Sequence, residues 1–110
     1  MVEYRVDQDA LFKALADPSR RRIVERLSQG ECTVGALAGP MNMSLAGASK
    51  HIGVLEEAGV LHREKRGRER VCKLDPNALF ALRDWVERYA VFWDQRLDAL
   101  DKALKEDRDE

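Results

Sequence analysis

The amino-acid sequence predicts a mainly α-helical fold with one small β-hairpin. Three observations support this prediction. Apolar residues recur at three- and four-residue steps in several short segments, two strand-like runs flank Gly67, and the last third of the chain carries one long apolar stripe. With 110 residues and a mass of 12.5 kDa, the chain is long enough for one domain, which we expect to span residues 1–110.

The first two predicted helices lie within the first thirty residues. The first covers residues 9–16, and the second begins at Asp17-Pro18 and ends near Gly30. Asp17 can cap the second helix. Pro18 lacks a backbone N–H, but at the first position of a helix this group has no acceptor within the helix, so its absence costs nothing. The apolar residues at helical spacing are Leu11, Phe12, Leu15, Ala16, Ile23, Val24 and Leu27. Three cations, Arg20 to Arg22, lie at the unfavourable end of the helix dipole, so they need nearby acids, a partner chain or DNA phosphate.

Two further helices follow a short strand-like segment over residues 31–33. Thr33 can cap the third helix, which Gly39-Pro40 ends. Ser44 caps a fourth helix that runs to about Ala58 and stops at Gly59. Its expected buried face consists of Leu45, Ala48, Ile52 and Leu55. A helix, a tight turn and a second helix with a short polar outer face predict a helix-turn-helix.

The predicted β-hairpin covers about residues 60–74 and would form a wing beside the fourth helix. Its two strand-like runs meet at Arg66-Gly67-Arg68, and its expected inward residues are Val60, Cys72 and Leu74. Together, the helix-turn-helix and the hairpin predict a winged helix-turn-helix.

The predicted last helix begins at Asp75-Pro76 and covers about residues 76–105, with the segment from residue 98 to 110 expected to fray into a charged tail. Its apolar positions are Leu79, Leu82, Trp85, Val86, Tyr89, Phe92, Trp93, Leu97, Leu100 and Leu104. That stripe is too long for so small a body to cover, so we expect the helix to pack against a partner.

Composition indicates a globular protein with a local basic patch. The chain is 45% hydrophobic and 35% charged, with a net charge of −1. The basic residues concentrate between positions 63 and 73, whereas acids dominate after Asp84. Phosphate binding depends on the local field and not on the total charge, so this patch is compatible with nucleic acid. No stretch is apolar enough to span a bilayer and the N-terminus is not a signal peptide, so we expect a cytoplasmic protein without membrane contact.

Several motifs together resemble the ArsR/SmtB family of bacterial transcriptional repressors. They are FKALADPSRRRIVERL, GECTVGALA, MSLAGASKHIGVLEEAGVL and the RGRERVCKLDP hairpin, and the resemblance extends from Leu11 to about Leu100. The segment from Ser44 to Leu61 is the most specific part. The aromatic-rich last helix resembles the subgroup that lacks the metal-binding motifs.

This resemblance implies a homodimer that binds double-stranded operator DNA, an imperfect inverted repeat with half-sites about 10 bp apart. It implies dimerisation through the first and last helices, with interface residues Leu11, Phe12, Leu82, Trp85, Tyr89, Phe92, Trp93 and Leu97. From the recognition helix, about residues 44–58, it implies DNA contacts by Ser44, Ser49, Lys50 and His51, with close approach at Gly47. From the wing it implies contacts by Arg66, Arg68 and Arg70.

A metal sensor is not expected, and we predict no cofactor. The resemblance aligns Thr33 and Gly35 with the two thiolate positions of one common metal site of the family, and Cys32 lies one residue out of step. The other common site needs histidines on the last helix, which has none. The only histidines, His51 and His62, cannot complete a closed zinc site with the two cysteines.

Three alternatives to a simple repressor remain open. Cys32 and Cys72 are expected on neighbouring strands, so they are either small buried hydrophobes or the thiols of a redox-responsive repressor. A small-molecule effector is a second possibility, including one bound among the aromatic residues of the last helix. The third is a winged-helix protein-interaction module. No nucleophile, acid and base occur at a spacing that predicts an enzyme.

Overall fold

The computed structural model describes residues 6–108. The described chain has the element order α1 (Gln8–Leu15), α2 (Pro18–Leu27), β1 (Cys32–Thr33), α3 (Val34–Ala38), α4 (Leu45–Glu57), β2 (Leu61–Arg66), β3 (Glu69–Leu74) and α5 (Pro76–Arg108). The first five residues and the last two, part of the N-terminus and tail considered above, lie outside the described residues.

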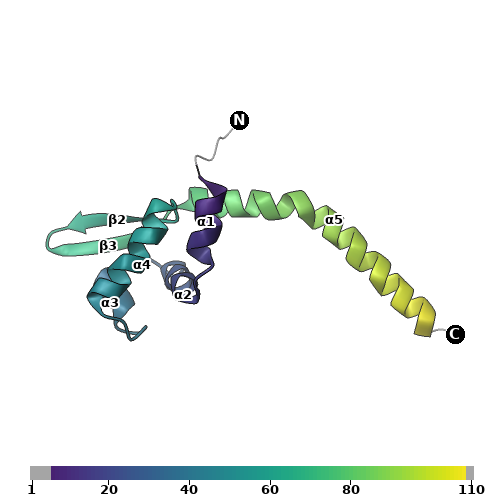
Figure 1. Ribbon diagram of the computed structural model, residues 1–110, viewed down its shortest axis with the longest axis horizontal. Coiled ribbons are helices and arrows are strands. Elements are labelled where there is room, and N and C mark those ends of the chain that lie inside the picture. Colours follow the sequence, from purple (N-terminus) through teal and green to yellow (C-terminus); the bar gives the residue numbers. More distant parts are fainter. Residues whose placement is uncertain (1–5, 109–110) are drawn as a thin grey trace.

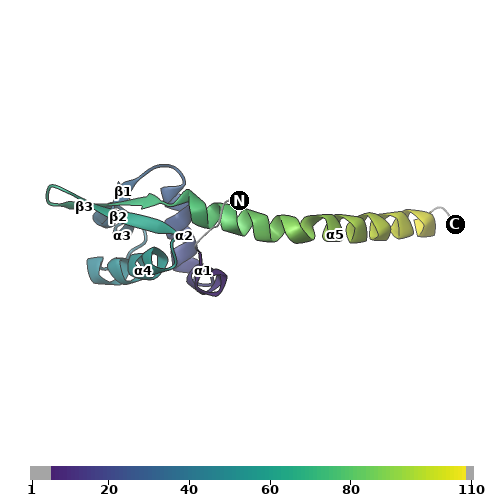
Figure 2. The same ribbon diagram turned by 90° about the horizontal axis from the view of Figure 1, so that it is seen from above.

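Helices α1 to α4 pack into a body from which the hairpin and α5 extend in opposite directions (Figure 1). Figure 2 shows α4 lying along one face of the small sheet and α5 continuing away from that sheet. The molecule is therefore elongated, with principal extents of 69 × 38 × 22 Å. The mainly helical fold with a small β-hairpin is confirmed.

The helix boundaries follow the capping residues that the sequence predicts. Asp17 accepts hydrogen bonds from the backbone N–H groups of Ser19 and Arg20 at 2.8 and 3.2 Å, with Pro18 in the first turn. Thr33 caps α3 through a 3.1 Å hydrogen bond from the N–H of Ala36. The chain leaves α4 at Gly59, whose φ of 80° suits a residue without a Cβ.

The sheet has three antiparallel strands in the order β1-β3-β2. Strands β2 and β3 form the predicted hairpin, in which Leu61 lies opposite Leu74 and Arg66 opposite Glu69. Gly67 makes the first turn residue with a φ of 62°, the position that a type II′ turn gives to glycine. Strand β1 joins the other edge of β3, so the sheet connects the segment before α3 to the wing.

The core lies where α1, α2, α3 and α4 meet the sheet and the first turns of α5. Its largest fully buried side chains are Leu11, Ile23, Leu37, Ile52, Leu55, Leu61, Val60 and Cys72. Apolar burial of this kind is the main stabilising contribution to a domain of this size.

Three predictions are corrected by the structure. Leu45 was expected on the buried face of α4, but it is 63% exposed because it lies in the first turn, beyond the edge of the core. Leu11 was expected at the dimer interface, but it is only 1% exposed because it faces the protomer's own core. The tail was expected to fray from residue 98, but α5 continues to Arg108, and in its last turns Lys105 pairs with Asp101 at 3.1 Å.

Within residues 6–108, none of the helices is both long enough and apolar enough to cross a membrane.

Candidate nucleic-acid interface

The N-terminus of α4 is exposed and held by its cap. The hydroxyl of Ser44 accepts a 3.0 Å hydrogen bond from the backbone N–H of Gly47. A Cβ at Gly47 would lie only 3.2 Å from that hydroxyl oxygen, so glycine leaves room for the cap. Both predicted contact residues therefore lie at the positive end of the helix dipole, where free N–H groups favour an anion such as phosphate.

The next three predicted contact residues occupy different environments on α4. Lys50 is exposed, whereas Ser49 and His51 are half-buried. The Ser49 hydroxyl accepts a 3.0 Å hydrogen bond from the Arg63 guanidinium of β2. His51 Nδ1 lies 3.5 Å from Nη1 of Arg20. Of the three, Lys50 is the cation that is freely presented to solvent.

The arginine cluster at the start of α2 owes its position to the preceding helix. Arg20 donates to the carbonyl oxygens of Lys13 at 3.1 Å and Ala14 at 2.5 Å. Arg21 donates to the carbonyl oxygens of Leu15 at 2.8 Å and Ala16 at 2.9 Å. The two guanidinium groups thus satisfy the open C-terminal end of α1, where cations are favourable. These carbonyl acceptors were not predicted from the sequence, although the short spacing between the two helices was the available signal.

Asp17 contributes to the same joint between α1 and α2. The backbone N–H of Arg20 holds the pKa of Asp17 below its ordinary value, even though partial burial opposes ionisation. Its carboxylate also lies 3.8 Å from the Arg20 guanidinium. The joint therefore connects the end of α1 to the start of α2, and through Arg20 it also reaches His51 on α4.

A groove of about 740 Å³ separates α3 and α4 from the wing. It brings together three predicted contact residues, Ser49, Arg68 and Arg70, with two that were not predicted as contacts, Leu45 and Arg63. Arg63 is paired with Glu56, and Glu69 also lines the groove, so Arg68 and Arg70 supply its excess positive charge, which suits a polyanion. The exposed Leu45 adds an apolar side chain to the lining.

Arg66 points to protein carboxylates and not into this groove. Its guanidinium donates to both carboxylate oxygens of Glu31 at 2.6 and 3.1 Å, and to Glu64 at 3.0 Å. These hydrogen bonds raise the pKa of Arg66 further above its ordinary value and lower the pKa of Glu31. The structure thus gives Arg66 a role in attaching the wing to the segment before β1.

Most of the predicted interface residues form an uncovered stripe along α5. Phe12 of α1 contacts Trp85 edge-on with 5.2 Å between ring centroids, and Trp85 contacts Tyr89 at 5.1 Å. An apolar hollow of about 390 Å³ lies among Trp85, Val86, Tyr89 and Trp93. Leu82 is half-buried against the core, while Phe92, Trp93 and Leu97 are 47–60% exposed. An uncovered apolar patch of this length indicates a protein interface.

The two cysteines lie directly opposite each other on β1 and β3, as predicted. Cys72 is fully buried and Cys32 half-buried, and both are free thiols. Burial raises the pKa of Cys32, and burial together with the neighbouring Cys32 raises that of Cys72 to about 11. At neutral pH both groups are therefore protonated, the unreactive form of a thiol. This environment favours the structural interpretation over the redox hypothesis.

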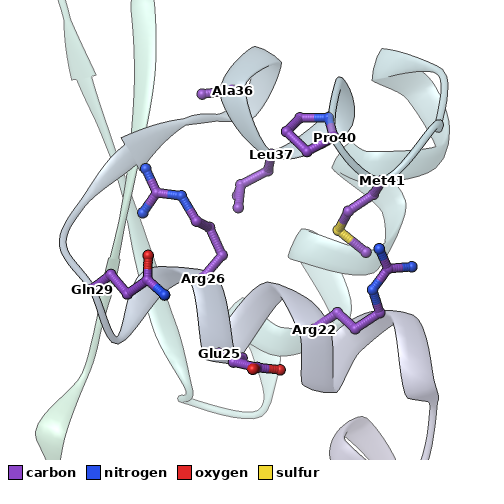
Figure 3. A pocket seen from close by; sticks show the side chains of 8 residues that line it. All are labelled: Arg22, Glu25, Arg26, Gln29, Ala36, Leu37, Pro40 and Met41. Carbon is purple, nitrogen blue, oxygen red and sulfur yellow. The ribbon is translucent and has the colours of Figure 1, made fainter.

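A small pocket of about 210 Å³ lies between α2 and the α3 region (Figure 3). Leu37, Pro40 and Met41 form its apolar side, and the side chains of Arg22 and Arg26 project on either side of them. Glu25 and Gln29 also line the pocket, so two guanidinium groups stand against one carboxylate, a balance that favours a small molecule with an apolar body and an acidic group. Among the described residues, no three His, Cys, Asp or Glu side chains gather in a way that could hold a metal ion.

Comparison with known proteins agrees with this geometry. Residues 15–64 match the family described as a helix-turn-helix domain. The chain is 37% identical to the HTH-type transcriptional regulator Rv2034 of Mycobacterium tuberculosis over 110 residues, covering 100% of this chain and 99% of the relative. It is 32% identical to the transcriptional repressor SdpR of Bacillus subtilis, covering 69% of this chain and 84% of the relative.

Solved structures show the same relationship. The crystal structure of an ArsR family transcriptional regulator is 38% identical, with a TM-score of 0.73, covering 79% of this chain and 96% of that one. A homodimeric winged helix-turn-helix DNA-binding domain from Mycobacterium bovis is 30% identical, with a TM-score of 0.63, covering 74% of this chain and 78% of that one. With its winged helix-turn-helix fold, this chain belongs to the ArsR family of transcriptional regulators.

Proposed function

We propose that the protein is a homodimeric repressor that binds an inverted-repeat operator and occludes a promoter. The observation that best supports this proposal is the groove between α4 and the wing, because it joins the recognition helix to two exposed arginines, Arg68 and Arg70. SdpR, a relative, is a repressor, and the related M. bovis domain is a homodimer. In this proposal residues 1–110 act as one domain.

The DNA-binding surface that we propose differs from the sequence prediction at two positions. It comprises Ser44, Leu45, Gly47, Ser49, Lys50, His51, Arg68 and Arg70. Arg66 is omitted because Glu31 and Glu64 already engage its guanidinium. Leu45 is added because it is exposed at the helix N-terminus, which commonly enters the major groove in helix-turn-helix proteins.

The dimer that we propose uses α1 and the apolar stripe of α5. The exposed rings of Phe12 and Trp85 already contact each other, so the two helices present one continuous aromatic surface. Two-fold symmetry would place the same stripe on both partners and bring two copies of α4 to one side of the dimer. The operator would then contain two half-sites about one helical turn apart.

A salt titration tests DNA binding against the protein-interaction alternative. Operator affinity should fall steeply with salt, because phosphate contacts release counterions. Lys50→Ala and Arg68→Ala should each reduce the magnitude of the salt slope by about one, as expected for the loss of one phosphate contact. Lys102→Ala, on the distal part of α5, is the control and should leave the slope unchanged. Binding without salt dependence, or equal slopes in all four proteins, would contradict the assigned surface.

Control by a small organic acid is a second candidate function, favoured by the pocket of Figure 3. One side of this pocket belongs to the α3 region, which packs against α4, so an occupant would act next to the recognition helix. The test is release of labelled operator by a panel of aromatic and branched-chain carboxylic acids. Release that is lost in Arg22→Met but retained in Lys102→Ala would support this site, and no release by any acid would reject it.

A further inference from the structure

Arg63 of β2 connects the wing to two residues of the recognition helix. Its Nη1 donates to the Ser49 hydroxyl at 3.0 Å. Its Nη2 and Nε donate to Glu56 Oε1 at 3.2 and 3.4 Å, and its backbone N–H donates to Oε2 of the same carboxylate at 3.1 Å. Because Ser49 and Glu56 are about two helical turns apart, these hydrogen bonds fix the rotation of α4 about its axis relative to the wing.

This contact is partly shielded from water. The Arg63 side chain is 22% exposed and that of Glu56 37%. A Cβ added to Gly53 would lie 3.7 Å from Arg63 Nη2, an ordinary van der Waals distance, so the guanidinium lies next to this glycine. Although burial opposes ionisation, hydrogen bonds from Arg63 lower the pKa of Glu56. The pair therefore stays charged at neutral pH.

The hydrogen bond from Arg63 decides which role Ser49 can play towards DNA. A serine hydroxyl has one hydrogen to donate and two lone pairs to accept with, whereas arginine only donates. Ser49 Oγ must accept from Arg63, so its own hydrogen is left for another partner. A base amino group approaching this oxygen would meet the guanidinium charge, whereas an acceptor atom would satisfy the free hydrogen.

We propose that Arg63 is a positioning residue that makes Ser49 a donor to a purine N7 in the major groove, and so gives the recognition helix a purine preference at one position of each half-site. This inference rests on the proposed DNA-binding function. Purine N7 is the fitting acceptor because both adenine and guanine present it in the major groove.

The experiment uses a duplex that the wild-type protein selects from a randomised pool, and a scrambled duplex of the same length. Affinities of wild type, Ser49→Ala, Arg63→Met and the double variant are measured by fluorescence anisotropy. Each single variant should bind the selected duplex about fivefold more weakly, the loss expected for one hydrogen bond, and the scrambled duplex nearly as wild type does. Because the two residues act as a unit, the double variant should be no weaker than either single variant.

Replacing each purine of the selected duplex in turn by its 7-deaza analogue provides the readout that a merely structural role would not change. In the wild type, one position per half-site should show a loss that Ser49→Ala and Arg63→Met no longer show. Arg68→Met is the matched control, since losing a phosphate contact should weaken both duplexes alike and preserve sensitivity to the analogue. Thermal unfolding checks that Arg63→Met is folded, and Ser49→Ala tests the same hydrogen bond without changing the ion pair.

Two outcomes separate this inference from the proposed function. If the wild type selects no duplex above the random pool, the proposed function itself fails. If it selects one, but the single variants weaken both duplexes equally or the analogue has no effect at any position, the role assigned to Arg63 and Ser49 is overturned.

Discussion

Replacing Trp93 with alanine tests the proposed dimer interface most directly. Trp93 is 59% exposed and lines the apolar hollow of α5. A tryptophan buries at most about 250 Å², so roughly 150 Å² remains for a partner to cover. At about 25 cal/mol per Å², complete burial stabilises the dimer by about 4 kcal/mol per protomer. A two-fold interface contains the residue twice, so the upper bound is about 7.5 kcal/mol.

Sedimentation velocity across nanomolar to micromolar concentrations measures this effect. Alanine keeps part of the buried area, so we expect the dimer dissociation constant to rise by about a thousandfold, corresponding to about 4 kcal/mol. Val91→Ala is the matched control, because Val91 is 65% exposed but lies about 200° around the helix from Trp93. The reasoning fails if Trp93→Ala sediments as the wild-type dimer does, or if Val91→Ala dissociates equally.

Four further predictions concern the sheet and the cap of α3. Iodoacetamide at pH 7.5 should modify Cys72 at least about tenfold more slowly than it modifies a thiol of the unfolded chain, and equal rates by mass spectrometry would contradict this. Burial raises the pKa of Cys72 to about 11, so the thiol of the unfolded chain loses its proton at a lower pH than the thiol of the folded chain. The urea concentration at the unfolding midpoint should therefore decrease as the pH rises from 9 to about 11. Thr33→Ala should lower the free energy of unfolding by about 1 kcal/mol in urea titrations, whereas Thr33→Ser should keep the cap; identical midpoints would refute its role. Arg66 lowers the pKa of Glu31, so the attachment of the wing should be retained above the ordinary glutamate value of 4.5 and lost as the pH falls through the folded value. Glu31→Gln at pH 7 should lower the hydrogen-exchange protection factors of residues 61–74, and unchanged protection would argue against this anchor.

Capping and turn residues made much of the fold predictable. Asp17, Thr33 and Ser44 each act within three residues of their own position, so their effect is visible in the linear sequence. The hairpin followed from strand-like runs on either side of Gly67. Even the opposed cysteines could be expected once the wing and the short strand were assigned to one sheet.

The errors arose where helical periodicity does not settle what covers a face. Leu45 continues the spacing of the buried face of α4, yet the core ends before the first turn. Leu11 and Phe12 are adjacent on α1, and only the folded body shows that Leu11 faces inward. The charged end of α5 has no core to pack against, but helical hydrogen bonds and the pair between Asp101 and Lys105 continue through it.

The partners of the charged side chains were the least predictable part of the candidate site. Arg66 meets Glu31 across 35 residues of sequence, and Arg63 reaches Ser49 across 14. No local pattern encodes such pairs, because the sheet brings them together. As a result, Arg63 and Arg66 bind protein groups, whereas Arg68, which looks similar in the sequence, remains exposed.

The contacts of Arg20 bear on how much variation in the spacing between operator half-sites the dimer would tolerate. This one guanidinium joins the end of α1, which belongs to the proposed dimer face, to His51 on α4. If this contact is rigid, the dimer would hold the α4 helices of its two protomers at one fixed distance and one fixed angle around the DNA axis. Inserting a single base pair between half-sites would then cost far more affinity than many changes within a half-site. Loosening the joint, for example with Arg20→Ala, would widen the range of tolerated spacers while leaving the sequence preference of each half-site intact.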